Sequence, residues 1–185
     1  TILRVIAGII RPDKGELLQV SAYSASLLVL QVGFVPHLTA RENIFLSGLI
    51  LGLSRRELAA KFDSVVAFSE LGEFIDEPIR TYSVGMRARL GFAISIQADP
   101  DILLVDEVLG VGDAAFREKS GAAMREKIKS NKTVVLVSHH EASIREFCDR
   151  VVWIERGSTV AEGAPADMLK QYQERSLPKK APVIP

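Results

Sequence analysis

Residues 81–113 (TYSVGMRARLGFAISIQADPDILLVDEVLGVGD) constrain the fold of this chain more than any other stretch. Ser83 stands where a helix should begin, and Gly85 leaves room for a phosphate to approach backbone N–H groups. Apolar residues then recur at helical spacing, which predicts a helix with one buried face. On these residues alone, an ordinary serine-capped helix start remains an open alternative.

The same stretch continues with a wholly apolar run, Ile102–Val105, that ends on two acids. Such a run is expected for a central parallel strand that is covered on both faces. Asp106 and Glu107 would then lie at the carboxyl end of the strand, where open α/β sheets bind ligands. Two adjacent acids are costly to bury without a cation or a solvated site, so the pair favours a ligand site over a strand that simply ends in solvent.

The order of a Ser-x-Gly helix, an apolar strand and an Asp-Glu pair resembles the signature and Walker B motifs of the ATP-binding cassette (ABC) ATPases. The variants Tyr-Ser-x-Gly-Met and Asp-Glu-Val-Leu-x-Val-Gly-Asp resemble most the cassettes of bacterial polysaccharide, O-antigen and teichoic acid exporters. The resemblance covers nearly the whole chain. It implies the α/β fold of a P-loop NTPase cassette with a helical subdomain, occupying residues 1–175.

The resemblance implies ATP and Mg²⁺ as the bound groups and assigns three residues to the chemistry. Glu107 would accept the proton of the attacking water, and Asp106 would support Mg²⁺, mostly through water. His139 follows a second apolar run and lies 32 residues after Glu107, as the switch histidine of these cassettes does. It would hold the γ-phosphate, although a lone histidine is more often structural.

Four further residues match motifs that act between subunits or with a membrane partner. Ser83 and Gly85 would bind the γ-phosphate of ATP held by a second subunit, which implies a homodimer. Asp113 matches the aspartate of the D-loop, which crosses the dimer interface, and it can also cap the next helix. Gln31 is the candidate for the glutamine that reaches Mg²⁺ and water, with a plain loop glutamine as the alternative. A permease would dock beside this loop, around Phe34.

The first residues read as a helix that ends at Gly8. In the resembled family this helix directly follows the phosphate-binding P-loop, so Thr1 would come just after the loop's Mg²⁺-binding hydroxyl residue. We therefore expect a fragment that lacks its N-terminal strands and P-loop and that is inactive alone. The alternative is a different protein that never had a P-loop.

A helical block separates the predicted strands. Thr39-x-x-Glu42 and Ser54-x-x-Glu57 are capping boxes that start helices. We expect residues 39–97 to form the helical subdomain, with the pair Arg55-Arg56 on a solvated face.

The rest of the chain reads as alternating strands and helices before a proline-rich end. The prolines predict that residues 176–185 are disordered. The expected strands are 16–20, 26–30, 102–105, 133–137, 151–155 and 158–162, and the expected later helices are 114–129, 141–148 and one that starts at Ala164-Pro165 and runs to about 175.

Composition excludes several classes of protein. The chain of 185 residues has 23 Lys and Arg against 23 Asp and Glu, and this neutral balance argues against nucleic acid as the partner. Its single cysteine, Cys148, cannot form an internal disulfide, which fits a reducing compartment. No apolar run reaches the roughly 20 residues of a membrane span. The resemblance therefore implies a peripheral protein on the cytoplasmic face of the inner membrane.

The sequence also bears on two other function classes. A soluble ABC ATPase of DNA repair or translation would be expected to carry long coiled-coil inserts or a second cassette, and the sequence has neither. A non-hydrolysing regulatory cassette is disfavoured for the full-length parent because Glu107 and His139 are both intact, whereas the expected lack of a P-loop favours that class for the fragment alone. The favoured function is ATP hydrolysis that drives export of a cell-surface polysaccharide or lipid-linked glycan.

Overall fold

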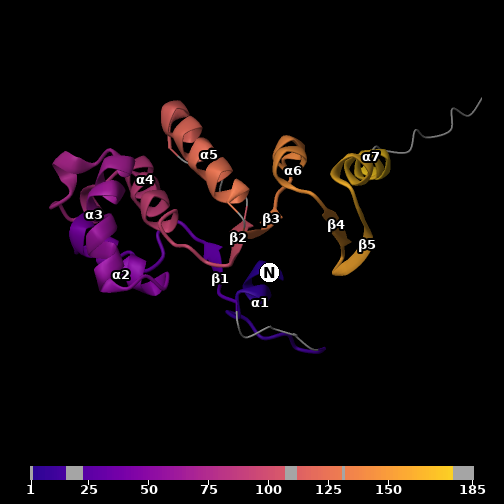
Figure 1. Ribbon diagram of the computed structural model, residues 1–185, viewed down its shortest axis with the longest axis horizontal. Coiled ribbons are helices and arrows are strands. Elements are labelled where there is room, and N and C mark those ends of the chain that lie inside the picture. Colours follow the sequence, from indigo (N-terminus) through magenta and orange to yellow (C-terminus); the bar gives the residue numbers. More distant parts are fainter. Residues whose placement is uncertain (1, 16–22, 107–111, 131, 177–185) are drawn as a thin grey trace, which may run out of the picture. The chain divides into compact units, whose positions relative to one another are not determined.

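The structure is a computed structural model that describes residues 2–15, 23–106, 112–130 and 132–176. These residues form two compact units, one through Val137 and one from Ser138 onward, which are described separately. The elements of the first unit are α1 (Ile2–Ile6), β1 (Ala25–Leu28), α2 (Ala40–Ile50), α3 (Arg55–Ser69), the 3₁₀ turns η1 (Gly72–Phe74) and η2 (Ile79–Thr81), α4 (Val84–Ser95), β2 (Ile102–Asp106), α5 (Ala114–Lys129) and β3 (Thr133–Val137) (Figure 1).

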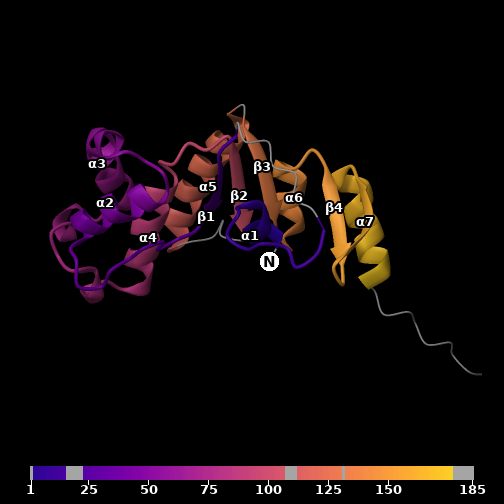
Figure 2. The ribbon, with the colours of Figure 1, turned by 90° about the horizontal axis from the view of Figure 1, so that it is seen from below.

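Three parallel strands form the sheet of the first unit, in the order β1–β2–β3 (Figure 2). The middle strand is β2, as its apolar sequence predicted, and residues 103–105 are buried. Leu28 of β1 pairs with Val105, and Asp106 pairs with Val137 of β3. The carboxyl ends of the three strands therefore lie at the same edge of the sheet.

The first strand differs from the sequence-based prediction. It ends at Leu28, whereas a strand through Leu30 was predicted. The chain turns at Leu30, and Gln31 takes a left-handed φ of +68°, which no strand residue can adopt. The predicted strand at 16–20 lies outside the described residues.

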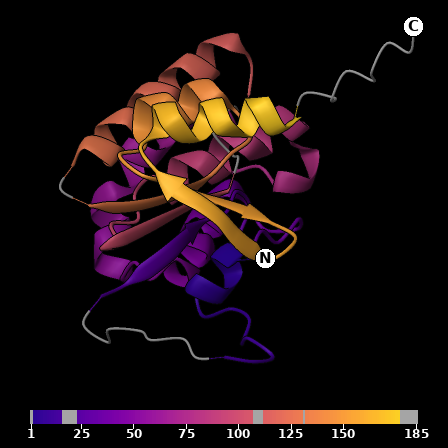
Figure 3. The same ribbon diagram turned by 90° about the vertical axis from the view of Figure 1, so that its right-hand side faces the viewer.

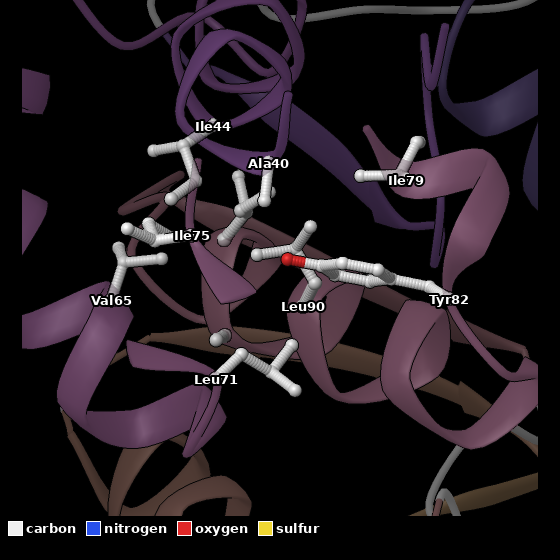
Figure 4. Close-up of a cluster of buried hydrophobic side chains, with 10 residues drawn as sticks. Ala40, Ile44, Val65, Leu71, Ile75, Ile79, Tyr82 and Leu90 are labelled. Carbon is white, nitrogen blue, oxygen red and sulfur yellow. The ribbon is translucent and has the colours of Figure 1, made fainter. Parts of the chain in front are cut away.

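A hydrophobic core joins α2, α3 and α4 (Figure 4). Both predicted capping boxes form: Thr39 caps α2 with Glu42 reaching back, and Ser54 caps α3 with Glu57 reaching back. That residues 39–97 act as a subdomain stays a prediction. The buried members of the core are Ala40, Ile44, Val65, Leu71, Ile75, Ile79, Tyr82, Leu90, Ala93 and Ile94.

A second core lies under the sheet strands and brings α4 and α5 together with them. The rings of Phe92 and Phe116 meet edge to face, with their centroids 6.1 Å apart. Each large apolar side chain buried in this way stabilises the fold by about 1.5–3 kcal/mol. The buried members are Leu28, Phe92, Leu103, Val105, Phe116 and Met124.

The second unit consists of α6 (Glu141–Phe147), the antiparallel pair β4 (Val151–Glu155) and β5 (Ser158–Gly163), and α7 (Pro165–Ser176). Figure 3 shows α7 running across the β4–β5 hairpin. Trp153 of β4 meets Tyr172 of α7 edge to face, with ring centroids 5.4 Å apart. Ser176 ends this helix instead of starting the predicted tail, and the rest of that tail lies outside the described residues.

None of the helices in the described ranges combines the length and the apolar character needed to cross a bilayer. Cys148 is partly buried, and this burial raises the pKa of its thiol, as expected for a small packed side chain.

Candidate functional site

Ser83 begins α4 as predicted. Its Oγ accepts a hydrogen bond from the backbone N–H of Met86 at 3.1 Å, and the side chain is exposed. A serine hydroxyl has two acceptor lone pairs and one donor proton, so capping leaves that proton available to a ligand. The first-turn N–H groups of the helix have no partner inside it, and they carry the positive end of the helix dipole. The start of α4 can therefore receive an anionic oxygen.

Gly85 lies in this first turn without any steric need to be glycine. A Cβ at this position would have the Ser83 Oγ, 3.8 Å away, as its nearest contact among the described atoms. Glycine inside a helix costs about 0.5–1 kcal/mol relative to alanine. The lack of close contacts around Gly85 and the stability cost of a helical glycine both fit a site where a ligand from outside the subunit approaches the backbone.

The carboxyl edge of the sheet carries Asp106 and, after β1, Gln31. Asp106 is the last residue of β2 and is exposed. Gln31 is also exposed, three residues beyond the end of β1. Since parallel strands present their carboxyl ends at one edge, both residues belong to the side of the sheet that binds ligands in open α/β folds.

The loop of Gln31 is fixed by α4. A Cβ on Gly91 would stand 2.7 Å from the backbone nitrogen of Gln31, so only glycine permits this approach. One turn further along α4, the Ser95 hydroxyl donates to the Val29 carbonyl at 3.0 Å. The helix that starts at Ser83 is thus attached along its second half to the segment that leads into Gln31.

Asp113 caps α5, as the sequence predicted. Its Oδ1 accepts a hydrogen bond from the N–H of Phe116 at 2.9 Å. Its other oxygen, Oδ2, is paired with the guanidinium of Arg89 on α4. The hydrogen bond from Phe116 and the charge of Arg89 both hold the pKa of this carboxyl below its ordinary value.

The two residues assigned to catalysis are placed differently from the others. Glu107 lies outside the described residues, directly after Asp106 in the chain. His139 belongs to the second unit, where its ring is 6.1 Å from that of His140 between centroids. The structure thus places Ser83, Gln31 and Asp113 on elements of one unit, and the functional roles of all the site residues stay proposals.

Sequence reasoning missed two residues that organise this region. Asn43 is fully buried, and its amide group bonds the carbonyls of Val35, Leu38 and Thr39 and the N–H of Val35. An asparagine next to buried helix positions was a signal that could have found it. Arg89 gave no such signal, because its partners lie 19 and 24 residues away in the chain.

Comparison with known proteins identifies the family. The sequence model of the ABC transporter family matches residues 1–110. The O-antigen export system ATP-binding protein RfbB of Klebsiella pneumoniae is 45% identical over 174 residues, which cover 94% of this chain and 70% of that protein. The RfbB protein of Myxococcus xanthus is 46% identical, over 94% of this chain and 40% of its own length. The teichoic acids export ATP-binding protein TagH of Lactococcus lactis is 40% identical, over 97% of this chain and 39% of that protein.

Solved structures show the same fold. An ATP-binding subunit of an ABC transporter superposes with a TM-score of 0.74 at 19% identity, over 95% of this chain and 77% of that chain. A dimeric ATP-binding cassette in a post-hydrolysis state, bound to ADP and Pi, superposes with a TM-score of 0.66 at 22% identity. The match covers 89% of this chain and 79% of that chain. This chain spans from 39% to 70% of the length of the three curated relatives named above. With its family match and its cassette fold, the chain belongs to the ABC transporter family.

Proposed function

We propose that this protein is the ATP-binding subunit of an ABC exporter and hydrolyses ATP to drive export of a cell-surface polysaccharide or lipid-linked glycan. The names of its relatives, which concern O-antigen and teichoic acid export, support this class of cargo. The observation that carries the proposal is the start of α4, where the Ser83 hydroxyl donates no hydrogen bond within the described part of the chain and a Cβ at Gly85 would meet only the Ser83 Oγ, at 3.8 Å, among the described atoms. Both features suit the approach of a γ-phosphate.

The active form in this proposal is a homodimer. Ser83 and Gly85 of one subunit contact the γ-phosphate of ATP held by the other, so neither subunit completes a site alone. Val84 between them is apolar and 72% exposed, which suits a position that a partner surface covers. Asp113 is the N-cap of α5 and pairs with Arg89 of α4. In the proposed dimer it belongs to the loop that crosses to the partner.

The chemistry requires positioning and charge stabilisation rather than a covalent intermediate. In the described ranges, no cluster of three or more side chains could hold a metal ion by itself. A single carboxylate such as Asp106 nevertheless fits Mg²⁺, which keeps several waters and takes substrate phosphates as ligands. When bound, Mg²⁺ neutralises charge that develops on the phosphates. Glu107 accepts the proton of the attacking water, while His139 and Gln31 orient that water and the γ-phosphate.

The partner in the membrane is a permease, and the protein acts on the cytoplasmic face of the inner membrane. We place its docking surface on exposed apolar side chains of the loop after β1 and of the end of α2, namely Val35, Leu49 and Ile50, which are 37%, 50% and 56% exposed. Phe34, which the sequence suggested as the contact, packs partly buried against the core of α2–α4 and so serves this role less well. The balanced charge of the chain supports the absence of nucleic acid among its partners.

The test is export in a strain that lacks the gene. Complementation with the unaltered gene should restore the glycan at the cell surface, and a Glu107→Gln gene should leave it inside the cell. ATPase activity that rises with the permease in proteoliposomes supports the exporter. Activity that rises with DNA or ribosomes instead would show a soluble ATPase of the non-transport class.

A further inference from the structure

One arginine on α4, Arg89, joins the end of α3 to the loop at Asp113 that the proposed dimer depends on. The Nη2 atom of Arg89 is paired with Asp113 Oδ2, and its Nη1 atom lies 3.2 Å from Glu70 Oε2. The side chain of Arg89 is 22% exposed, whereas those of Glu70 and Asp113 are 51% and 53% exposed, so solvent screens these pairs in part. Glu70 is the C-cap of α3 and Asp113 is the N-cap of α5. The guanidinium of Arg89 therefore links α4 to both α3 and α5.

The surroundings of Arg89 fix its position on both sides. Lys119 of α5 binds the second oxygen of Glu70 at 2.7 Å and donates to the carbonyl of Phe68 at 3.0 Å. The Cζ atom of Arg89 lies 5.4 Å from the ring centroid of Phe116, and the ring of Phe68 meets that of Phe116 edge to face. The charged groups therefore lie on an aromatic layer and have a defined arrangement.

The residue type matters at this position. A guanidinium presents a planar fork of donors that can serve two carboxylates at once, whereas a lysine ammonium acts as a single point charge. Asp113 uses one oxygen to cap α5 and the other for Arg89, so both of its acceptor atoms are engaged. A shift of α4 relative to α5 would break one of these bonds or carry Asp113 with it.

We propose that Arg89 is a positioning residue that couples phosphate binding at the start of α4 to the dimer-crossing loop at Asp113. This inference rests on the proposed function and adds how the two ATP sites of the dimer communicate. Ser83 and Arg89 lie six positions apart on one helix, about 9 Å along its axis. The buried part of that helix, Leu90 to Ser95, packs into both hydrophobic cores, and in this proposal α4 carries a displacement at its start to Arg89.

The test compares Arg89→Gln, Arg89→Lys and unaltered protein in steady-state ATP hydrolysis. With two coupled sites, the Hill coefficient of the unaltered protein should lie above one and below its limit of about two. We expect Arg89→Gln to lower this coefficient toward one and to lower kcat about tenfold, within the range of loss that follows misplacement of a catalytic group. Arg89→Lys should lower the Hill coefficient and kcat less than Arg89→Gln does. Arg41→Gln, which removes the exposed Arg41–Asp76 ion pair, is the control and should change neither.

A double-mutant cycle separates coupling from loss of stability. If Arg89 acts through Asp113, adding Arg89→Gln to Asp113→Asn should lower kcat no further. An active protein whose Arg89→Gln variant keeps its kcat and cooperativity contradicts the inference alone, as do losses that multiply in the double variant. Unaltered natural protein that hydrolyses no ATP contradicts the proposed function itself, and the inference with it.

Discussion

The backbone nitrogen of Gln31 lies so close to Gly91 that a Cβ on that glycine would stand 2.7 Å from it. The loop after β1 and the middle of α4 are therefore in direct main-chain contact. Since α4 also carries Ser83 at its start, the proposed glutamine loop and the proposed phosphate-binding turn are attached to one rigid helix. A change at either end of α4 has to be accommodated at the other.

Gly91→Ala should therefore destabilise the protein. The added methyl group meets backbone atoms that cannot rotate away, and such overpacking costs about 1–3 kcal/mol. The free energy of unfolding from urea titration measures this loss. Gly121→Ala on α5 is the matched control, because the described residues place only the Arg125 guanidinium nitrogens within 4 Å of its Cβ, at 3.8 Å. Gly121→Ala should raise stability by up to about 1 kcal/mol; equal effects of the two variants would contradict the close contact.

Gly85→Ala should separate stability from function. Among the described atoms, a Cβ at Gly85 would meet only the Ser83 Oγ, at 3.8 Å, so the variant should unfold at the same or a higher urea concentration than the natural protein. In the proposed dimer, the methyl group would occupy the path of the γ-phosphate, and ATP hydrolysis should fall by about 10²-fold. A Gly85→Ala protein that is stable and fully active would remove this turn from the ATP site.

Asn43→Ala should loosen the loop between Gln31 and α2. The amide of Asn43 holds Val35 through both its N–H, at 2.7 Å, and its carbonyl, at 3.1 Å. Leaving these groups unpaired costs about 1–3 kcal/mol, and hydrogen exchange of the Val35 amide should become fast. Ser47→Ala on the same helix is the control, since the buried Ser47 hydroxyl has no hydrogen-bond partner within the described part of the chain. Unchanged protection of Val35 in Asn43→Ala would show that the amide does not hold this loop.

Leu49→Asp should uncouple the protein from its permease without affecting ATP hydrolysis by the isolated protein. Leu49 is half exposed near the end of α2, away from the buried core, so a charge there is tolerated by the fold. Co-purification with the permease and glycan export are the measurements. Arg56→Glu, which changes charge on the exposed face of α3, should leave both unchanged. Normal co-purification of Leu49→Asp would place the docking surface elsewhere.

Local sequence signals predicted most of the fold. The helix α5 and the strands β3 and β4 have the predicted bounds, and α3 starts after Ser54 as predicted, because capping residues and apolar runs act over a few positions. The serine at the start of α4 and the aspartate at the start of α5 could be identified for the same reason. The exceptions are informative: β1 ends early because Gln31 turns with positive φ, which no local composition signals.

The contacts between elements could not be predicted in this way. The pairing of Arg89 with Asp113 depends on how α4 and α5 pack, and the need for glycine at position 91 depends on where the Gln31 loop passes. Such features follow from the arrangement in three dimensions and leave no periodic mark in the sequence. The motifs thus indicated which residues to examine, and the structure shows what holds them.

The central claim concerns Glu107, and one substitution tests it most directly. Glu107→Gln keeps the shape and hydrogen-bonding reach of the side chain but removes the proton acceptor and one negative charge. Hydrolysis by the natural protein should fall by about 10²-fold or more, the range for loss of a general base. Binding should survive, because the ground-state phosphates do not need the carboxylate of Glu107.

Light scattering of Glu107→Gln with Mg-ATP is therefore the decisive measurement. The account predicts a doubled mass, as the ATP-bound homodimer forms and cannot hydrolyse its nucleotide. Asp106→Asn is the control: it should weaken support of Mg²⁺ and give no trapped dimer. A Glu107→Gln protein that stays monomeric with Mg-ATP and turns over ATP at the natural rate would contradict the account.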